Sequence, residues 1–456
     1  MNNFSKRAVS SLVLLIITLS VMLSSLTSCN LFAYVAESEE EIRQNIQQSL
    51  SDDGSGNEYV ADYLRDWGLP KFDKVKFIYM ETCFIQVYNY EEGLPDTLAH
   101  AAETAELFIE YFYNDIDRSN KKTVTDSLLY CYVDVIDDPY SIYRPPTESA
   151  DYATDMSGKF VGIGVGVEYN DADESIMINT VYPSSPAEEA GVKVGDYIYA
   201  IDGKTLTELG YTNAVNYIRG EKGTQVELTL IRGGEKVTVN VTRDEIEEIN
   251  VDYSIDESTG IGYVRIVSFK KNTFDQFVNA IDALEAANVK GIVFDVRGNP
   301  GGYVDSVCDV ISYIIPTGHT VLSYQYKGRP ATELKSTDGA KNTDHVIDLP
   351  ITVICNEYTA SAGEIFTAAI RDYRDEGLLR ASIVGTNTFG KGIMQNTYYY
   401  LDDSSVTLTV AYYNPPCGEN YHGKGVTPDV VIENTEEEDL QLLTAYAELL
   451  ELINAN

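Results

Sequence analysis

Short runs of consecutive apolar residues alternate with helical patterns from Gly260 onward, and this succession constrains the fold more than any other feature of the chain. The stretches "VKGIVFDVR" and "LPITVICNE" have the pattern of buried strands, while "TFDQFVNAIDALEAAN" has the apolar spacing of a helix. Strands that alternate with helices build a partly parallel sheet whose functional sites lie at the strand ends. The sequence therefore predicts a mixed α/β core over residues 246–434.

A β-rich block precedes this core. Residues 160–243 contain the alternating stretches "FVGIGVGVEY", "SIMINTVY", "YIYAIDG" and "TQVELTLIRGGEKVTVNVTR", with short helical patterns in "SSPAEEAG" and "YTNAVNYIRG". We expect a separate compact domain over residues 158–245. The glycine-containing loop at its start, whose residues are Gly162, Ile163, Gly164 and Val165, either makes a tight turn or gathers backbone N–H groups that bind a carboxylate.

Helical patterns lie on either side of these two domains. Residues 97–150 form an N-terminal helical region, in which apolar residues recur at three- and four-residue spacing as far as Ile136. The prolines of "DDPYSIYRPP" then predict a loop and a domain boundary. The C-terminal segment 435–456 is an amphipathic helix that either packs on its own domain or joins copies of the chain into a homo-oligomer.

The N-terminus has the features of an export signal. Lys6 and Arg7 precede the apolar run "LVLLIITLSVML", which is too short to span a membrane comfortably. The following "LTSC" resembles the lipobox of bacterial lipoproteins, which implies that Cys29 is lipidated and becomes the mature N-terminus. Residues 1–29 are then a lipoprotein signal, residues 30–96 are an acidic tether and an unassigned region, and the protein is extracytoplasmic and anchored to the bacterial cell membrane. A plain signal peptide and an uncleaved anchor are the alternatives.

The composition argues against several classes of partner. The formal net charge is −38, so no basic stripe is available to bind a nucleic acid. The cysteine spacings match no metal pattern and no HExxH signature occurs, so we expect neither a metal site nor a cofactor. We expect the cysteines beyond Cys29 to be mostly buried small apolar residues, with at most two disulfides.

Lys391 lies in a loop that resembles a phosphate-binding loop with one residue changed. "GTNTFGKGIMQ" matches G-x-x-x-x-G-K, but Gly392 replaces the Ser or Thr that would hold magnesium. The next segment is rich in β-branched and aromatic residues and predicts a strand hairpin, whereas a phosphate loop must open a helix. Lys391 therefore needs a role other than nucleotide binding.

Ser361 is a candidate nucleophile because it follows a buried strand at the start of a helix, where backbone N–H groups point outward. Lys391 can serve as its base, since burial can leave a lysine amine neutral at working pH. Gln395 can fix that amine if the intervening glycines bend the strand. His422 is an alternative base. In a further alternative, Lys391 is a solvated surface residue and Gln395 only occupies a strand face.

Four motifs occur in a fixed order behind the β-rich block: "DVRGNPGG", "TASAGEIF", "GTNTFGKGIMQ" and "GKGVTPDV". The stretch "SPAEEAGVKVGDYIYAIDGKTL" resembles bacterial PDZ domains, and "DDPYSIY" stands before it. Together they resemble the carboxyl-terminal processing peptidases, which are tail-specific serine proteases. The resemblance covers residues 105–431 and implies that Ser361 is the nucleophile, Lys391 the general base and Gln395 the residue that orients it.

The same resemblance implies an oxyanion hole and a site for the substrate tail. The oxyanion hole would use the backbone N–H of Gly301 or Gly302 together with that of Ala362. The loop from Gly162 to Val165 would bind the terminal carboxylate of a protein or peptide substrate while an edge strand pairs with its backbone.

Two other functions fit the sequence. A catalytically silent protein would keep the PDZ domain and capture peptide tails without cutting them, although the complete set of Ser361, Lys391 and Gln395 argues against it. A hydrolase of small esters has no distinguishing feature in its favour. The physiological substrate is not specified by the sequence.

Overall fold

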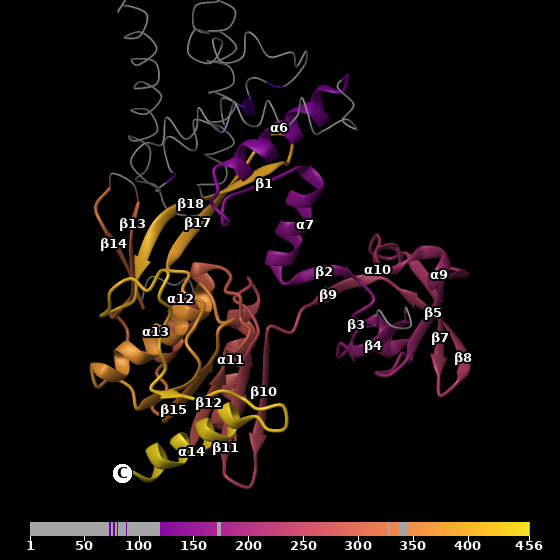
Figure 1. The fold of residues 1–456 in the computed structure, drawn as a ribbon. Helices are drawn as coiled ribbons and strands as arrows, with labels where there is room; N and C mark the ends of the chain where they lie inside the picture. Colours follow the sequence, from indigo (N-terminus) through magenta and orange to yellow (C-terminus); the bar gives the residue numbers. More distant parts are fainter. Residues whose placement is uncertain are drawn as a thin grey trace, which may run out of the picture. The chain divides into compact units, whose positions relative to one another are not determined.

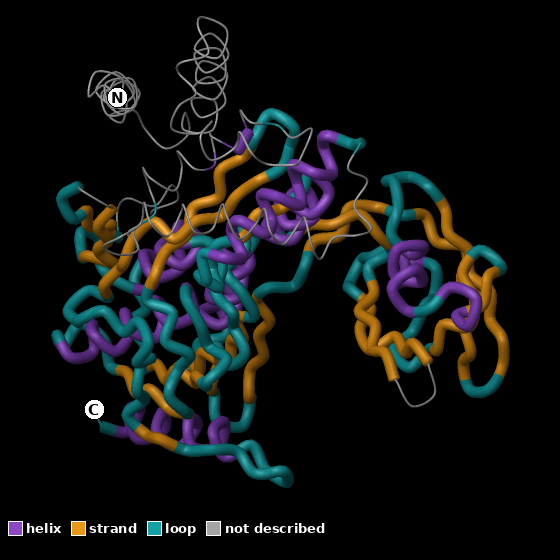
Figure 2. Tube along the Cα trace, turned by 45° about the horizontal axis from the view of Figure 1, so that its top comes forward, coloured by secondary structure: helices purple, strands orange, loops and turns teal. Residues whose placement is uncertain are grey.

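The computed structural model describes residues 119–170, 175–326, 329–336 and 345–455, together with Asp73, Lys76, Phe77, Met80 and Tyr88. The predicted signal, Cys29, most of residues 30–96 and the part of the predicted helical region before residue 119 lie outside the described residues. Figure 1 labels the helices and strands, and Figure 2 colours the chain by secondary structure. The chain divides into two compact units. Unit 1 comprises Met1–Tyr152, Leu322–Leu334 and Lys391–Gly423, and unit 2 comprises Ala153–Val321, Lys335–Gly390 and Lys424–Asn456.

A six-stranded sheet forms the centre of unit 2, in the order β10-β11-β12-β15-β16-β19. All neighbouring strands from β11 to β19 are parallel, and only β10 runs antiparallel to its neighbour. Strands β12 and β15 are buried throughout, because helices cover both faces of a parallel sheet. The alternation of strands and helices predicted for this segment is thus confirmed. The strands are β10 Val251–Asp256, β11 Ile261–Ile266, β12 Gly291–Asp295, β15 Ile351–Cys355, β16 Ala381–Gly385 and β19 Val430–Val431.

Helices α11 (Thr273–Ala286), α12 (Val304–Ile314) and α13 (Ala362–Asp375) lie on one face of this sheet, and α14 (Leu440–Asn454) lies on the other (Figure 1). Successive residues of β12 point to opposite faces. Phe294 therefore stacks on Phe277 and contacts Phe366, while Val293 packs in the cluster that contains Leu449 of α14. The C-terminal helix thus packs on its own domain, which was one of its two predicted fates.

Leu449 anchors α14 closely to the sheet, since a Cβ placed on Gly291 would lie only 2.9 Å from the Leu449 Cδ1. Leu449 is fully buried, whereas its neighbour Leu450 is 37% exposed. We expect Leu449→Ala to lower the free energy of unfolding by about 2–5 kcal/mol, because it leaves a cavity, and Leu450→Ala to lower it by less than about 1 kcal/mol. Urea unfolding measures both, and equal losses would contradict the packing described.

A second sheet of unit 2 forms the predicted β-rich domain, in the order β3-β4-β5-β7-β8 with β6 paired to β5. In β7 every second residue is buried, as Val226, Leu228 and Leu230 show, because one face covers the core. Strand β3 is at the edge of the sheet. The elements are β3 Val165–Asn170, β4 Ser175–Val181, α8 Pro186–Glu189, β5 Tyr197–Ile201, β6 Lys204–Thr205, α9 Leu206–Leu209, α10 Tyr211–Ile218, β7 Gln225–Arg232 and β8 Glu235–Thr242. A separate antiparallel ribbon, β2 (Lys159–Gly162) with β9 (Asp244–Glu247), forms the two ends of this domain.

Unit 1 contains a sheet of order β1-β18-β13-β14, to which β17 adds by pairing with β18. Strands β17 and β18 form an antiparallel hairpin directly after Gly392, so the predicted hairpin is confirmed. The strands are β1 Ile142–Arg144, β13 Thr320–Tyr326, β14 Thr332–Lys335, β17 Ile393–Tyr399 and β18 Ser405–Asn414. Helix α6 spans Lys121–Val135, within the predicted N-terminal helical region.

The prediction of a loop over "DDPYSIYRPP" is wrong in part. Its residues Ile142–Arg144 form strand β1, which pairs with the start of β18, and helix α7 (Pro146–Ser157) begins at Pro146. Pro146 occupies the first helical position, where a missing N–H removes no helical hydrogen bond. The sequence did not predict this strand, because it has only three residues and pairs with a strand about 260 residues away, so it shows no local periodicity.

The described cysteines form no disulfide bonds. Cys131, Cys308 and Cys355 are buried, as expected, but Cys417 is exposed. Burial, followed by the charges of nearby carboxylates, raises the pKa of the Cys355 thiol to about 12. Such a thiol stays protonated and behaves as a small apolar side chain.

Candidate active site

Ser361 is the N-cap of α13, directly after the loop that leaves β15. Its backbone has φ 52° and ψ −116°, a conformation that costs a non-glycine residue on the order of 1–3 kcal/mol. A strained turn between a strand and a helix is a known means of exposing a serine hydroxyl. The local geometry therefore fits the predicted nucleophile.

The Ser361 turn is hydrogen-bonded to the loop that follows β12. The hydroxyl of the fully buried Thr359 donates to the Val296 carbonyl at 2.8 Å, and the Ala360 N–H donates to the Asn299 carbonyl at 2.8 Å. Strands β12 and β15 are parallel neighbours, so the loops after them leave the same edge of the sheet. The sheet thus brings the "GNPGG" loop to the Ser361 turn.

Glu364, in the first turn of α13, is a fully buried carboxylate that the sequence analysis did not single out. Its Oε2 accepts the Ser361 N–H at 2.9 Å, and its Oε1 accepts the Thr388 hydroxyl at 2.6 Å and the Gly390 N–H at 2.7 Å. Gly390 directly precedes Lys391 in the chain. Glu364 therefore fixes both the backbone of the nucleophile and the loop that leads into the predicted base. The Ser-x-x-Glu spacing of a capping box is the signal that would have identified it.

The glycine loop contacts the nucleophile through its backbone. Gly301 has φ +105°, and a Cβ added to it would lie 2.7 Å from the Ser361 Cβ and 3.0 Å from the Ala362 nitrogen. The structure thus brings Gly301, Ser361 and Ala362 together, as predicted from the motifs. However, the Gly301 N–H donates to the Oδ1 of buried Asn299 at 2.8 Å. Because this N–H is already used, Gly302 is the better placed of the two alternative oxyanion donors, Gly301 and Gly302.

The backbone N–H of Gly302, unlike that of Gly301, does not donate to Asn299 in the bonds described. The Phe269 N–H donates to the Gly301 carbonyl at 2.9 Å, and the Tyr303 N–H donates to the Phe269 carbonyl at 2.7 Å. This is a parallel bridge between Phe269 and Gly302, in which the N–H of Gly302 points away from Phe269. Ala362 begins α13, and the first N–H groups of a helix have no acceptor within the helix. Gly302 and Ala362 are thus the candidate oxyanion donors.

An ion-pair network fixes the other end of the glycine loop. The Arg297 guanidinium donates to both carboxylate oxygens of Asp295, the nearest at 2.6 Å, and to Asp439 at 2.8 Å. Asp439 is the N-cap of α14. Burial raises the pKa of Asp439, but the Arg297 hydrogen bond, the Leu442 N–H and the Arg297 charge outweigh it and hold the pKa below its ordinary value. The loop after β12 is thereby tied to the C-terminal helix.

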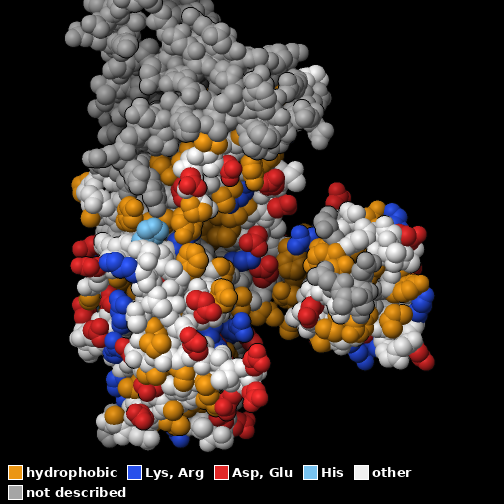
Figure 3. Space-filling view, in the orientation of Figure 1, with side chains coloured by type: hydrophobic (Ala, Val, Ile, Leu, Met, Phe, Trp, Pro, Cys, Tyr) orange, Lys and Arg blue, Asp and Glu red, His pale blue; other side chains and the backbone are white. Residues whose placement is uncertain are grey.

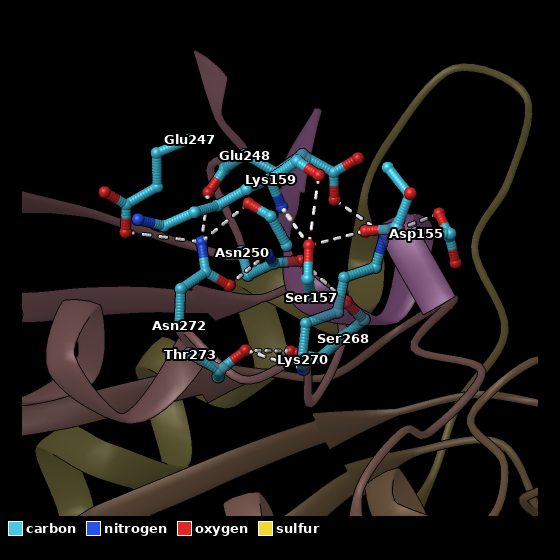
Figure 4. A network of polar contacts seen from close by, with 12 residues as sticks. Asp155, Ser157, Lys159, Glu247, Glu248, Asn250, Ser268, Lys270, Asn272 and Thr273 are labelled. Atoms are coloured by element: carbon cyan, nitrogen blue, oxygen red, sulfur yellow. Dashed lines mark hydrogen bonds and ion pairs between the residues drawn. The ribbon is translucent and has the colours of Figure 1, made fainter. Parts of the chain in front are cut away.

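Asn272, just before α11, connects the β2–β9 ribbon to the core sheet (Figure 4). Its Nδ2 donates to the carbonyl oxygens of Gly158 at 3.2 Å and Glu248 at 2.9 Å, and its Oδ1 accepts from Asn250 at 2.9 Å. A Cβ on Gly158 would lie 2.1 Å from the Asn272 Oδ1, so the amide is tightly enclosed. One side chain thus joins both ends of the β-rich domain.

Lys270 strengthens this junction and lies next to Phe269. Its Nζ pairs with Asp155 at 2.8 Å and Glu248 at 2.6 Å (Figure 4). Burial lowers the pKa of Lys270, but the hydrogen bonds to both carboxylates outweigh it and raise the pKa above its ordinary value. Phe269 pairs with Gly302. The ends of the β-rich domain are therefore hydrogen-bonded to the segment that pairs with the glycine loop.

Lys391 and Gln395 belong to unit 1, whereas Ser361 belongs to unit 2. The Tyr413 hydroxyl donates to the Lys391 carbonyl at 2.5 Å, and the Lys391 Nζ lies 4.7 Å from the centre of the Tyr140 ring. Gln395 follows an irregularity in the pairing of β17 with β18, between Met394 and Gln395. The alternative base His422 also lies in unit 1, with its ring 5.9 Å from that of Tyr412.

The predicted carboxylate loop runs from the end of β2 to the start of β3. Gly162 is the last residue of β2 and Val165 the first of β3. Ile163 is buried, and its carbonyl accepts the Ala187 N–H at 2.9 Å, which fixes the loop to α8. Gly164 has φ +79° and packs on Ser185, whose Cβ would be 2.3 Å from a Cβ at this position. A side chain at Gly164 is therefore disfavoured both by the positive φ and by the clash with Ser185.

Three observations concern the surface charges, the metal-ligating side chains and the helices of the described residues. Figure 3 shows acidic and basic side chains interspersed over the visible face of the described residues. Within those residues, no group of three or more His, Cys, Asp or Glu side chains is placed to hold a metal ion. Likewise, no described helix is long and apolar enough to cross a membrane.

Comparisons with known proteins identify the family. The model for peptidase family S41 matches residues 260–432, and a PDZ domain model matches residues 177–232. The chain is 32% identical over 340 residues to a probable CtpA-like serine protease of Staphylococcus haemolyticus (strain JCSC1435), covering 74% of this chain and 66% of that protein. It is 33% identical over 329 residues to the carboxy-terminal processing protease CtpA of Bacillus subtilis (strain 168), covering 72% of this chain and 68% of that protein. The solved photosystem II D1 C-terminal processing protease aligns with a TM-score of 0.44 at 24% identity, covering 78% of this chain and 92% of that one.

The chain therefore belongs to peptidase family S41, among the carboxyl-terminal processing serine endopeptidases. Its alignments span about two thirds of the length of the curated relatives, 66% and 68%. The resemblance inferred from the motifs is confirmed, as is a mixed α/β fold with a PDZ domain and a protease domain.

Two glycines of one loop test the oxyanion geometry. In Gly301→Ala the new methyl group would displace the Ser361 turn, so we expect kcat to fall by about 100-fold or more. Gly298 also has positive φ, at +71°, but no atom lies within 4 Å of a Cβ there. Gly298→Ala should therefore cost stability through backbone strain and change kcat less than about threefold. Steady-state peptidase kinetics with thermal unfolding of both variants make the comparison, and equal losses of kcat would contradict the close approach.

Proposed function

We propose that this protein is a membrane-tethered, extracytoplasmic endopeptidase that binds the C-terminal tails of its substrates and cuts them with Ser361, Lys391 and Gln395. The observation that best supports this is the Ser361 turn, a strained nucleophile site enclosed by a glycine loop and fixed by a buried carboxylate. A protein that only captured tails would have no need to maintain this strain.

In the proposed reaction, the neutral amine of Lys391 accepts the proton of the Ser361 hydroxyl as its Oγ attacks the scissile carbonyl carbon. The N–H groups of Gly302 and Ala362 stabilise the oxyanion, at about 3–4 kcal/mol for a well-placed donor. The tetrahedral intermediate collapses when the Lys391 ammonium returns the proton to the leaving amine, which leaves an acyl-enzyme. Water then attacks the ester, Lys391 accepts its proton and returns it to Ser361, and the new carboxylate leaves.

The PDZ domain supplies tail recognition in this proposal. Strand β3 is an edge of its sheet, so an extended peptide can add to it through backbone hydrogen bonds. The loop from Gly162 to Gly164 lies at the start of that strand, where the terminal carboxylate would reach its backbone N–H groups. Its fixation to α8 through Ile163 and Gly164 keeps the loop in shape without the substrate.

A cleavage assay tests the mechanism. The substrate is an unstructured protein with an apolar C-terminal tail, made with a free carboxylate and with an amidated end. We expect Ser361→Ala and Lys391→Ala each to lower kcat by about a thousandfold or more, and wild-type activity to rise between about pH 6 and 10 as the amine loses its proton. The amidated tail should raise KM, because it removes a charge-assisted hydrogen bond.

His422→Ala is the control for the identity of the base. Full activity in Lys391→Ala with loss in His422→Ala would exclude the Ser/Lys mechanism. Binding of the tail without cleavage by the wild-type protein would instead identify a silent binding protein. Equal cleavage of both tails would remove the role proposed for the carboxylate loop.

Membrane attachment is proposed through Cys29, on the basis of the "LTSC" motif after the apolar run. We expect the wild-type chain, expressed in a bacterium, to fractionate with the membrane and to incorporate a radiolabelled fatty acid. Cys29→Ser should lose the label, because the proposed site of lipidation then has no thiol. Label retained in Cys29→Ser would exclude this site of lipidation.

A further inference from the structure

The "DDPYS" motif has no role in the mechanism so far, yet it forms a turn beside both predicted partners of the nucleophile in unit 1. We propose that Asp138 is a positioning residue that orients the amide of Gln395 and holds Tyr140 against Lys391. This inference rests on the proposed Ser/Lys/Gln mechanism and deepens it, because it explains how the residue next to the base acquires a single orientation.

Asp138 is buried and accepts three hydrogen bonds within unit 1. Its Oδ2 accepts the Ser141 hydroxyl at 2.6 Å and the Thr409 hydroxyl at 2.9 Å, and its Oδ1 accepts the Tyr140 N–H at 3.1 Å. Thr409 lies in the middle of β18 and is fully buried. The turn is closed by the Ser141 N–H, which donates to the Asp138 carbonyl at 3.0 Å. An ionised carboxylate can only accept, so each of these bonds has a fixed direction.

The direction of these bonds determines which end of the Gln395 amide faces Thr409. A hydroxyl has one hydrogen, and that of Thr409 is used by Asp138, so the Thr409 oxygen can only accept from Gln395. The Gln395 Nε2 donates to it at 3.3 Å. The two ends of an amide are otherwise interchangeable in shape. Asp138 therefore forces the NH₂ group of Gln395 toward Thr409 and leaves its carbonyl oxygen directed away.

A carbonyl oxygen is the end of the amide that a lysine base requires. A lysine amine in either protonation state carries N–H donors, so a fixed acceptor beside it holds the nitrogen in place while its lone pair takes the serine proton. With the opposite orientation, the amide NH₂ would compete for that lone pair. The register of β17 against β18 shifts between Met394 and Gln395, and this shift brings Gln395 opposite Thr409.

The same carboxylate determines the position of Tyr140. Its Oδ1 accepts the Tyr140 N–H, and the ring of this tyrosine lies 4.7 Å from the Lys391 Nζ. An aromatic face at this distance covers the amine and restricts its rotation. Asp138 thus acts on Lys391 by two routes, one through Thr409 and Gln395 and one through Tyr140.

A purely structural role is the competing explanation, because this network also joins the start of β1 to β18. The Thr409 N–H donates to the Ser141 hydroxyl at 3.4 Å. The chain offers a matched control two residues earlier on β18, where the buried Thr407 hydroxyl accepts from Arg144 of β1 at 2.7 Å. Thr407 joins the same two strands but does not contact Gln395 in the bonds described.

The test compares Thr409→Val, Thr409→Ser, Asp138→Asn and Thr407→Val in the full chain, solubilised in detergent, with the free-tail substrate. We expect Thr409→Val and Asp138→Asn to lower kcat by about tenfold or more with little change in KM, because they release the Gln395 amide. Thr409→Ser keeps the hydroxyl and should retain most of the activity. Thr407→Val should lower the unfolding midpoint about as much as Thr409→Val and leave kcat nearly unchanged.

A double-mutant comparison separates positioning from stability. If Thr409 acts through Gln395, adding Gln395→Ala to Thr409→Val should cost little beyond Gln395→Ala alone. Fully additive losses, or a loss of kcat in Thr407→Val equal to that in Thr409→Val, would overturn the positioning role. Full activity in Lys391→Ala would instead overturn the proposed mechanism itself. Loss in Lys391→Ala and Gln395→Ala with full activity in Thr409→Val would overturn this inference alone.

Discussion

The candidate active site depends on one buried carboxylate, that of Glu364. A buried carboxylate is costly unless hydrogen bonds compensate it, and here three donors from two segments of the chain do so. Through these bonds the carboxylate holds the Ser361 backbone and the loop before Lys391 in place. The strained conformation of Ser361 persists because its surroundings leave it no relaxed alternative that keeps these bonds.

The parallel sheet explains why the other parts of the site converge. Parallel neighbours end at the same edge, so the loop after β12 and the turn after β15 meet there. Asn299 accepts the Ala360 N–H with its carbonyl and the Gly301 N–H with its side chain, which joins the turn after β15 to the glycine loop. The β-rich domain joins the same region, because Asn272 and Lys270 bind its ends next to Phe269.

Unit 1, like unit 2, contains a buried carboxylate that accepts several hydrogen bonds. Asp138 is a second buried carboxylate whose acceptor-only chemistry imposes a direction on its neighbours' hydrogen bonds. Glu364 accepts hydrogen bonds from groups next to the predicted nucleophile. Asp138 accepts them from groups that contact Lys391 and Gln395, the proposed base and its positioning residue. In both cases the charge acts through residues that it fixes in place, without itself taking part in the proposed chemistry.

The sequence by itself determined the features that repeat locally. Strand and helix periodicity predicted the alternating core, the β-rich domain and the hairpin after Gly392, and motif order indicated the family. Tertiary structure alone decided that Ile142–Arg144 is a strand, that Glu364 binds Gly390 and that the Gly301 N–H is used by Asn299. The physical reason is that periodicity reports only which face of an element is buried. Hydrogen bonds between segments depend on where the folded sheet places chain regions that are remote in sequence, and no local pattern encodes that.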